Sequence, residues 1–372
     1  MRIAIISDTH FGYARFEEDS YVQAENAFLD ANEKADLIIY AGDVFDTKNP
    51  KLETINRAVE ILKKTKKKIY AIHGNHERRS KGMVNPAQLL ATMGLFEYLH
   101  GNAGIFECNG EKLQIFGLSN VPEDLASIAL KKTLENFKAE ESAFKILVLH
   151  QSIKELIPHA KEEISLEELE QLPFDLIING HIHGKVTKLG GRFIIPGSTV
   201  VTQLKKDETS ARGYVLYDTK TKSNEFVEIP CRKFFYEDLS FNNASIAEVK
   251  NAVGQKIGEL KRQDSSAVIR IKISGTVKEG LMPADLTFAS LENVYVDNDL
   301  DAGNLKGRLQ KIKNAREQKL SVRELAIKEL EDRIKDRIKR FSVRELFEKL
   351  AIGTDEAMEY VKNTKDGETT HL

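Results

Sequence analysis

The first half of the chain alternates short apolar runs with amphipathic stretches. Five runs rich in Ile, Leu and Val have the composition of buried strands, and they occupy residues 3–6, 37–40, 69–72, 146–149 and 176–178. Apolar residues recur at helical spacing between several of these runs, as in Ile55–Leu62 and Ala126–Phe137. The alternation predicts an α/β fold whose strands are covered on both faces.

Each of the five runs ends at a short polar motif. The motifs are Asp8-Thr9-His10, Gly42-Asp43, Gly74-Asn75-His76-Glu77, His150-Gln151 and Gly180-His181-Ile182-His183. Five of the nine histidines of the chain lie in these motifs. Ligands of open α/β sheets bind beyond the carboxyl ends of the strands, so we expect the five motifs to converge on one edge of one sheet.

The pattern changes in the second half of the chain. Strands broken by turn residues are expected at Phe193–Ser198, Tyr214–Asp218 and Glu225–Ile229, as successive strands of a second sheet. A smaller βαβ-type module follows, with strand-like Lys233–Leu239, Ala267–Ile273 and Val294–Val296 and helical apolar spacing over Ala244–Lys261.

The C-terminal part is expected to be helical. Residues 304–340 are dominated by Lys, Arg, Glu and Leu, which indicates a long solvated helix. Ser321 and Ser342 each begin a Ser-x-x-Glu capping box, and two short amphipathic helices surround Gly353. The predicted organisation is a domain at 1–231 that carries the five motifs, a small capping domain at 232–300, a charged helical linker at 301–340 and a helical segment with a polar tail at 341–372.

Composition restricts the classes of protein. A chain of 372 residues needs two or more domains, and 41% hydrophobic with 30% charged residues is a soluble composition. The net charge of −2 gives no overall attraction to a polyanion, so positive charge must be local or come from metals or a partner. Cys108 and Cys231 form no disulfide framework or thiolate zinc motif, and no signal peptide or membrane-spanning run is present, so we expect a cytoplasmic protein.

The side chains of the motifs predict a metal centre. They offer nitrogen and oxygen ligands without thiolate, which suits manganese, iron or zinc. Two such metals about 3.5–4 Å apart can activate water and hydrolyse a phosphoester. Asp43 is the best candidate for a bridging carboxylate because it arrives on a neighbouring strand. Any one of these residues alone could be an ordinary core residue, but five motifs at five strand ends disfavour that interpretation.

The order Asp-x-His, Gly-Asp, Gly-Asn-His-Glu, His and Gly-His-x-His resembles the calcineurin-like metallophosphoesterases. Within that superfamily, Asp8–Tyr13, Gly42–Phe45 and His150-Gln151 resemble the SbcD-type DNA double-strand-break repair nucleases, the archaeal form of the meiotic recombination eleven family. The motifs cover roughly residues 1–200, and the small module and helical C-terminus behind them are also similar. The resemblance implies a two-sheet α/β/β/α sandwich and a two-metal DNA nuclease, with 3′→5′ exonuclease activity on double strands and endonuclease activity on single strands.

The resemblance also implies roles for single residues. One metal is expected at Asp8, His10, Asp43 and His183, and the other at Asp43, Asn75, His150 and His181, with Asp43 bridging. Manganese is the implied ion. His76 is implied to bind no metal and to face the scissile phosphate, where it stabilises charge or protonates the leaving oxygen.

One position departs from the family pattern. Some members carry a histidine three residues after the bridging aspartate, where this chain has Asp46. An ionised carboxylate cannot donate a hydrogen bond to phosphate, but it could orient a ligand histidine. The role of that histidine therefore does not carry over to this chain.

Several basic and histidine residues outside the ligand set have two interpretations. Arg78, Arg79 and Lys81 could meet DNA phosphates or form a solvated loop. The run Lys63–Lys68 is expected at a helix end, where cations suit the helix dipole. A packing or supporting role is expected for His73, and none for His100 and His159.

The implied partners are DNA ends and an SMC-like, coiled-coil ABC ATPase (SbcC in bacteria). The C-terminal helices are expected to dock on that ATPase, although packing back on this chain is the alternative. The capping module is implied to position DNA, or it only braces the active site. Family members form homodimers through helices near the catalytic domain, and Pro86–Met93 with Leu95–Leu99 is a candidate that could equally be core.

Two other functions stay open. One is a phosphodiesterase or phosphatase of the same superfamily that acts on a small or protein substrate. Protein phosphatases have Asp-Arg-Gly soon after the bridging aspartate, whereas Asp46-Thr47-Lys48 follows here. The other is a non-catalytic binder of DNA ends with a vestigial site, which the complete motif set disfavours.

Overall fold

The computed structural model describes residues 1–80, 82–135, 137–157, 164–278, 281–302, 324, 327 and 342–363. Its contacts divide the chain into two units. The first unit contains Met1–Leu239, Asn251–Ile273 and Phe288–Asp297, and the second contains Ser240–Lys250, Ser274–Thr287 and Asn298–Leu372.

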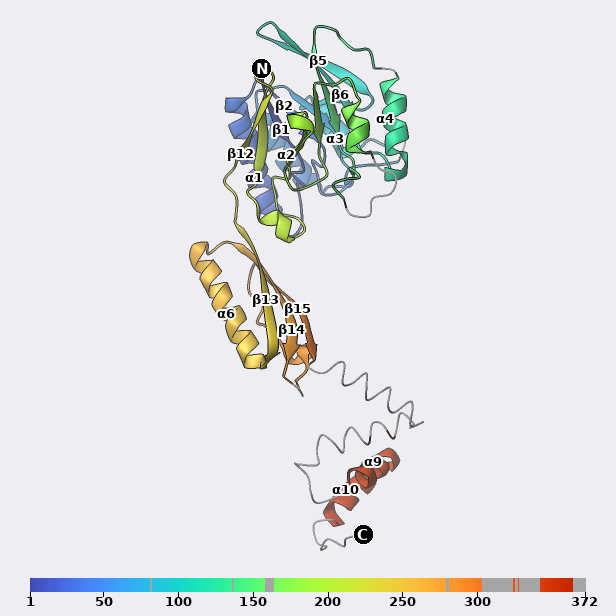
Figure 1. Cartoon of the computed structure of the whole chain (residues 1–372), viewed down its shortest axis with the longest axis vertical. Helices are drawn as coiled ribbons and strands as arrows, with labels where there is room; N and C mark the ends of the chain where they lie inside the picture. Colours follow the sequence, from blue (N-terminus) through green and yellow to red (C-terminus); the bar gives the residue numbers. More distant parts are fainter. Residues whose placement is uncertain are drawn as a thin grey trace. The chain divides into compact units, whose positions relative to one another are not determined.

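Two six-stranded sheets form the centre of the first unit (Figure 1). The first sheet has the order β12-β11-β1-β2-β3-β4, made of β12 (Ser223–Glu228), β11 (Gly213–Asp218), β1 (Arg2–Ile6), β2 (Leu37–Ala41), β3 (Ile69–Ile72) and β4 (Glu97–Tyr98). The second has the order β5-β6-β7-β8-β10-β9, made of β5 (Asn102–Cys108), β6 (Glu111–Leu118), β7 (Phe144–Leu149), β8 (Leu176–Asn179), β10 (Phe193–Ile195) and β9 (Val186–Lys188).

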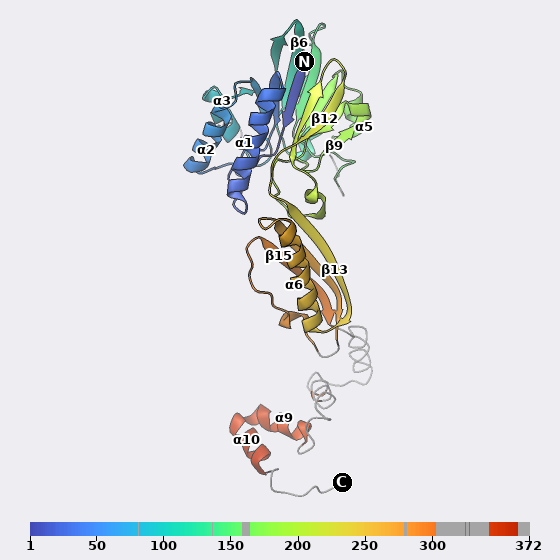
Figure 2. The same cartoon turned by 90° about the vertical axis from the view of Figure 1, so that its left-hand side faces the viewer.

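The sheets pack face to face, and helices cover both outer faces (Figure 2). Ile3 and Ile5 of β1 lie in the core between the sheets, whereas Ala4 and Ile6 lie in the core under the helices. Both faces of the strand are buried, which explains an apolar run without polar alternation. The first sheet is covered by α1 (Glu17–Lys34), α2 (Leu52–Lys63) and α3 (Pro86–Thr92), and the second by α4 (Ala126–Leu134) and α5 (Leu166–Glu170). The predicted α/β/β/α sandwich is confirmed.

The start of helix α3 is fixed by side chains at its N-terminus. Asn85 accepts a hydrogen bond from the backbone N–H of Gln88 at 2.9 Å, and the Gln88 side chain accepts one from the Asn85 backbone N–H at 3.0 Å. This capping box and Pro86 at the first helical position fix the start of the helix. Leu90 is buried in the core, whereas Leu89 and Met93 are exposed, so only one face of this segment is core.

Two expectations about sheet membership are wrong. The five strands that precede the motifs do not share one sheet, because β1, β2 and β3 belong to the first sheet and β7 and β8 to the second. The strands near 214–218 and 225–229 do not follow β10 into the second sheet either. β11 pairs antiparallel with β1, with Arg2 opposite Asp218, and β12 pairs with β11. Hydrophobic periodicity marks a strand but does not choose its partner.

A third sheet has the order β13-β14-β15. It consists of β13 (Phe234–Ala244), β14 (Val268–Val277) and β15 (Val294–Ala302), with α6 (Ile246–Gln263) between the first two. These strands are longer than predicted because their outer ends have mixed polarity. The short 3-10 helices are η1 (Glu123–Leu125), η2 (Leu189–Gly191), η3 (Lys206–Thr209) and η4 (Pro283–Asp285).

Two helices near the C-terminus, α9 (Val343–Ile352) and α10 (Thr354–Asn363), match the predicted pair. Ser342 caps α9 by accepting a hydrogen bond from the Glu345 backbone N–H at 3.3 Å. The expected linker helix at 304–340, the Ser321 box and the polar tail lie outside the described residues, apart from positions 324 and 327. Within the described residues, no helix is long and apolar enough to cross a membrane.

Candidate active site

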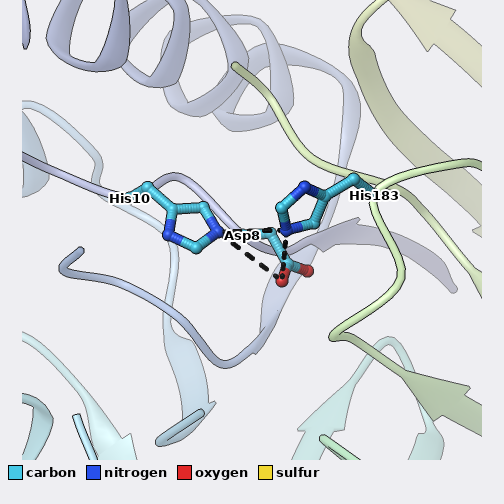
Figure 3. A group of neighbouring side chains, drawn as sticks. All are labelled: Asp8, His10 and His183. Carbon is cyan, nitrogen blue, oxygen red and sulfur yellow. Dashed lines mark hydrogen bonds and ion pairs between the residues drawn. The ribbon is translucent and has the colours of Figure 1, made fainter. Parts of the chain in front are cut away.

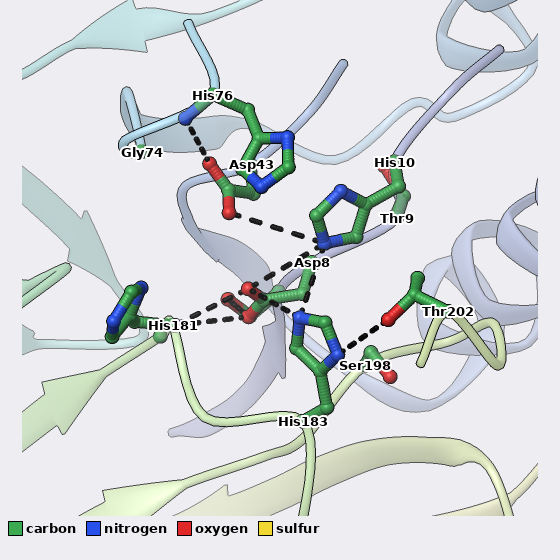
Figure 4. Close-up of polar contacts among 12 residues, drawn as sticks. Asp8, Thr9, His10, Asp43, Gly74, His76, His181, His183, Ser198 and Thr202 are labelled. Atoms are coloured by element: carbon green, nitrogen blue, oxygen red, sulfur yellow. Dashed lines mark hydrogen bonds and ion pairs between the residues drawn. The ribbon is translucent and has the colours of Figure 1, made fainter. Parts of the chain in front are cut away.

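The five motifs meet where the two sheets lie against each other. The loops after β1, β2 and β3 bring Asp8, Asp43 and Asn75, and the loops after β7 and β8 bring the histidines 150, 181 and 183. Figure 4 draws Asp8, Asp43, His181 and His183 of this set together. The predicted residues lie close together, but two facing sheets, rather than one edge of one sheet, bring them there.

The backbone in these loops is unusual. Asp8, His10, Asp43 and His181 have φ angles of 53°, 45°, 50° and 75°, in the left-handed region that side chains other than glycine rarely adopt. Such conformations persist only where the surroundings enforce them, and they concentrate at functional sites.

Glycine is required at positions 42 and 74, beside Asp43, for two different reasons. Gly42 has a φ of +91°, so the tight turn expected there requires glycine. Gly74 needs glycine for space, because an added Cβ would lie 2.0 Å from Asp43 Oδ1. The carboxylate of Asp43 therefore occupies room that only a glycine leaves.

Asp8, His10 and His183 form a compact group (Figure 3). Nε2 of His10 and Nε2 of His183 lie 3.2 Å apart, and each lies within 4.0 Å of Asp8 Oδ1. Asp8 is fully buried, and its carboxylate accepts hydrogen bonds from the backbone N–H of His181 at 3.2 Å.

A second group surrounds the carboxylate of Asp43. Nε2 of His150 lies 3.2 Å from Asp43 Oδ2 and 3.1 Å from Asn75 Oδ1. Nδ1 of His181 lies 2.9 Å from the same Asn75 oxygen. Nε2 of His10 is 3.9 Å from Asp43, which therefore faces both groups.

His76 stands at the side of these groups. Its backbone N–H donates to Asp43 Oδ1 at 3.1 Å, and its ring lies edge-on to His10 with centroids 4.8 Å apart. The side chain is 36% exposed, whereas Asp8, His10, Asp43 and His150 are buried. Its Nδ1 lies 2.8 Å from the Asp46 carbonyl oxygen, and since a carbonyl cannot donate, Nδ1–H is the donor.

Buried partners orient two of the histidines. Nδ1 of His150 donates to the Ala41 carbonyl at 2.7 Å, which leaves Nε2 for the carboxylates. Nδ1 of His183 donates to Thr202 Oγ1 at 2.7 Å, and Thr202 in turn donates to Glu208 Oε1 at 3.3 Å.

No pattern in the sequence indicates this support for His183. Glu208 also accepts from the backbone N–H groups of residues 202 and 203, and buried Arg212 donates to its carbonyl at 2.6 Å. These residues lie in no motif, and their only sequence signal is charge within an otherwise apolar segment. Ser152, with Oγ 3.2 Å from His181 Nε2, was likewise missed.

Glu77 joins two motif loops. Its buried carboxylate accepts hydrogen bonds from the backbone N–H of Phe45 at 2.8 Å and of Gly74 at 2.9 Å. Burial and the nearby Asp43 carboxylate raise the pKa of Glu77 to about 8. Glu77 therefore holds the two loops together, and it belongs to none of the candidate metal groups found among the described residues.

The electrostatics of the site favour positive charge. Burial raises the pKa of Asp8, and the histidines 150 and 183 oppose that effect. Burial also acts to raise the pKa of Asp43, but His150 outweighs it and holds this pKa well below its ordinary value. Burial lowers the pKa of His150, yet the carboxylates of Asp43 and Asp8 overcome it and raise the value to about 9.

The pKa values of His181 and His183 are shifted in opposite directions. Burial, followed by the neighbouring His150, lowers the pKa of His181 to about 4. Burial also lowers that of His183, but Glu208 and Asp8 outweigh it and the pKa rises. The site thus combines carboxylates, which attract protons and cations, with histidine nitrogens that can serve as ligands.

These residues fit divalent metal ions. Asp8 and Asp43 are 0% and 1% exposed, and in the described part of the chain the basic side chains within 4.0 Å of them are histidines. Nitrogen and oxygen ligands without thiolate suit manganese, iron or zinc. The groups Asp8–His10–His183 and Asp8–Asp43–His150 each place their ligand atoms within 4.8 Å of one another. A third such group contains His76 with His10 and Asp43, so proximity alone does not separate His76 from the ligands.

The remaining residues singled out in the sequence lie elsewhere. His73 is buried and stacks on Tyr98, and His100 lies beside it. Lys63 ends α2, as the helix-end interpretation requires. Arg78 and Arg79 follow His76 on the surface, whereas Lys81 and His159 are outside the described residues.

Residues 1–185 match the family model of the calcineurin-like phosphoesterases. In these residues the chain belongs to that family. The match spans all five motifs, and the resemblance inferred from them is confirmed. Hydrolysis of phosphoesters is the chemistry that the family name states.

Curated relatives match beyond that domain. The chain is 26% identical over 334 residues to the DNA double-strand break repair protein Mre11 of Methanocaldococcus jannaschii, covering 82% of this chain and 88% of the relative. It is 26% identical to the protein of the same name from Sulfolobus acidocaldarius, covering 74% of this chain and 76% of the relative. It is 28% identical to the double-strand break repair protein MRE11 of Encephalitozoon cuniculi, but spans 43% of that protein.

Proposed function

We propose that the protein is a metal-dependent DNA nuclease that processes double-strand breaks. The observation that carries this proposal is the extent of the similarity to Mre11 proteins, which covers 82% of this chain rather than the phosphoesterase domain alone. The proposed activities are 3′→5′ exonuclease on double strands and endonuclease on single strands.

We assign the metals to the two groups of side chains described above. One is held by Asp8, His10, Asp43 and His183, and the other by Asp43, Asn75, His150 and His181. Manganese is the proposed ion. Bound at this pair of sites, divalent metals would lower the pKa of a water molecule and neutralise charge on the phosphate oxygens.

His76 is the proposed proton donor. Because Nδ1–H is engaged by the Asp46 carbonyl, the neutral ring has no hydrogen on Nε2. Nε2 can then donate a proton to a leaving oxygen only when the ring is an imidazolium.

A basic pocket beside His76 is the proposed contact for the DNA backbone. Its volume is about 640 Å³, and its lining includes Lys48, Arg78 and Arg79. Arg78 donates to Asn120 Oδ1 at 2.8 Å, and Arg79 donates to the Val84 carbonyl at 3.1 Å, so both side chains are held at the pocket. Because the net charge of the chain is −2, attraction to a DNA backbone needs positive charge that is concentrated locally, and these side chains supply it.

A direct assay tests the function. The purified chain is incubated with manganese and linear DNA, a chromogenic phosphodiester or a phosphopeptide. We expect DNA cleavage that depends on manganese, with little turnover of the other two substrates. Turnover of the phosphopeptide in preference to DNA would identify a phosphatase instead.

The proposed partner is an SMC-like ABC ATPase that docks on α9 and α10. Leu350, Ile352 and Met358 are 51%, 70% and 59% exposed, and these helices of ten residues each are too short to be stable alone. Truncation after about residue 340 should abolish ATPase binding in a pull-down and spare nuclease activity. Undiminished binding would place the docking surface elsewhere.

A homodimer is the proposed assembly. Met83, Val84, Leu89 and Met93 expose 38% to 60% of their surface around α3, which forms an apolar patch beside the catalytic loops. Leu89→Asp should convert a dimer into a monomer in light scattering. A parent chain that is monomeric at micromolar concentration would contradict this assembly.

A further inference from the structure

His10 lacks a support that neighbouring histidines have. His150 and His183 each donate Nδ1–H to a buried oxygen, at 2.7 Å in both cases, and so direct Nε2 into the site. The Nδ1 atom of His10 is buried and has no hydrogen-bond partner among the described residues. Its Nε2 nevertheless faces the site, at 3.2 Å from Nε2 of His183, 4.0 Å from Asp8 and 3.9 Å from Asp43.

Asp46 lies where the missing partner should be. Its Oδ1 atom is 3.3 Å from Nδ1 of His10. The position is fixed by the backbone, because Phe11 and Phe45 form a parallel bridge and the Asp46 N–H donates to the Phe11 carbonyl at 3.2 Å. The two loops therefore run side by side, which keeps the carboxylate beside the ring.

The same residue also contacts His76. The Asp46 carbonyl accepts from His76 Nδ1–H at 2.8 Å, and its carboxylate lies 3.6 Å from the same nitrogen. A change of the Asp46 side chain leaves the carbonyl in place. Substitution of the side chain therefore removes the carboxylate from both rings but keeps the hydrogen bond that orients His76.

We propose that Asp46 is a positioning residue that keeps the hydrogen of His10 on Nδ1 and commits Nε2 to the metal. A neutral imidazole has one N–H and one lone pair, so a hydrogen on Nε2 would remove His10 from the ligand set. Ligand histidines generally donate their second ring N–H to a carboxylate or carbonyl. This inference rests on the proposed function, since it requires that a metal binds at this site.

The first test is a calorimetric titration of the full chain with manganese. The variants are Asp46→Asn and Asp46→Ala, with Asp124→Asn as a control at an exposed carboxylate outside the site. We expect both Asp46 variants to bind manganese roughly 10- to 100-fold more weakly than the parent, and the control to bind equally. Melting of each variant in chelator shows whether it is folded, and the two variants give independent readings.

The second test reads the ring directly. Nitrogen NMR of histidine-labelled, metal-free protein distinguishes the two neutral forms of His10, whose signals are identified by their loss in His10→Ala. We expect hydrogen on Nδ1 in the parent and a shift of population to Nε2 in both Asp46 variants. A merely structural role would leave this distribution unchanged.

The outcomes separate this inference from the proposed function. A parent chain that binds no manganese overturns both. A parent that binds, with folded Asp46 variants that bind equally or keep the parent distribution at His10, overturns only the role of Asp46. Weaker binding together with the shifted distribution supports it.

Discussion

At the residue scale, the candidate ligands are held in a costly backbone conformation. Asp8, His10, Asp43 and His181 all have positive φ angles. A left-handed conformation costs an ordinary residue roughly 1–2 kcal/mol relative to its usual regions. The loop conformation that brings the ligand candidates together therefore lowers the free energy of unfolding. A matched pair of substitutions can measure this loss.

Asp8→Gly and Asp8→Ala both remove the carboxylate and its hydrogen bonds. Only the glycine variant also relieves the positive φ of 53°. In chelator, we expect Asp8→Gly to be more stable to urea than Asp8→Ala by about 1 kcal/mol, with neither variant active. Equal stabilities would mean that this backbone is not strained.

His76→Ala should separate metal binding from proton transfer. The His76 side chain is 36% exposed, compared with 1% for His10, 0% for His150 and 13% for His183. It contacts Asp46 through Nδ1. We expect unchanged manganese affinity and a loss of cleavage rate of about 10²–10⁴-fold. His100→Ala, outside the motifs, is the control. Parent activity in His76→Ala would remove it from the mechanism, and lost metal binding would make it a ligand.

The residue scale also shows what motifs reveal and what they omit. All eight predicted site positions, the seven ligand candidates and His76, meet in one place because each stands at a strand end. Thr202, Glu208 and Arg212 were not predicted, since they act through contacts with His183 and with one another across a loop. A pattern along the chain cannot show a hydrogen bond between distant segments.

At the element scale, the strands were predicted well and their partners were not. The apolar runs became β1, β2, β3, β7 and β8 within a residue or two. Which strands belong to which sheet depends on the pairing of β11 with β1. This pairing joins residues distant in the sequence, such as Arg2 and Asp218. Such pairing is decided by packing of whole sheets, which local periodicity does not contain.

The loop after β3 carries the proposed DNA contact. Arg79→Ala should weaken binding to duplex DNA similarly for all sequences, because phosphate contacts carry no base information. We expect the slope of log affinity against log salt to fall by about 0.9 if one phosphate contact is lost. Lys132→Ala on α4 removes the same charge outside the pocket. Equal slopes in both variants would exclude Arg79 from the DNA contact.

At the scale of the whole molecule, the site spans two sheets. Asp8, Asp43 and Asn75 follow strands of the first sheet, whereas His150, His181 and His183 follow strands of the second. A metal bound by both sets acts as a cross-link between the two halves of the sandwich. Metal affinity and the stability of the fold should therefore be linked.

Removal of metal should lower the melting temperature. A ligand present at a thousand times its dissociation constant stabilises the folded state by about 4.1 kcal/mol. For a catalytic domain of this size we expect a fall on the order of 10 °C in chelator, measured by calorimetry. Asp43→Ala is the control, because it loses the carboxylate shared by both groups and should melt alike with and without manganese. A parent that melts alike in both conditions would contradict the cross-link.

The return of β11 to β1 also has a consequence for synthesis on the ribosome. β1 is the first strand to be synthesised, but its antiparallel neighbour β11 is complete only after residue Asp218 has been added. Until the segment from His150 to His183 has followed, the nascent chain carries Asp8 and Asp43 without His150 and His183, two of the histidines that offset their charge. Two carboxylates that cannot be buried alone would hold the unfinished sheet open, so the catalytic loops should take their final form only late in translation.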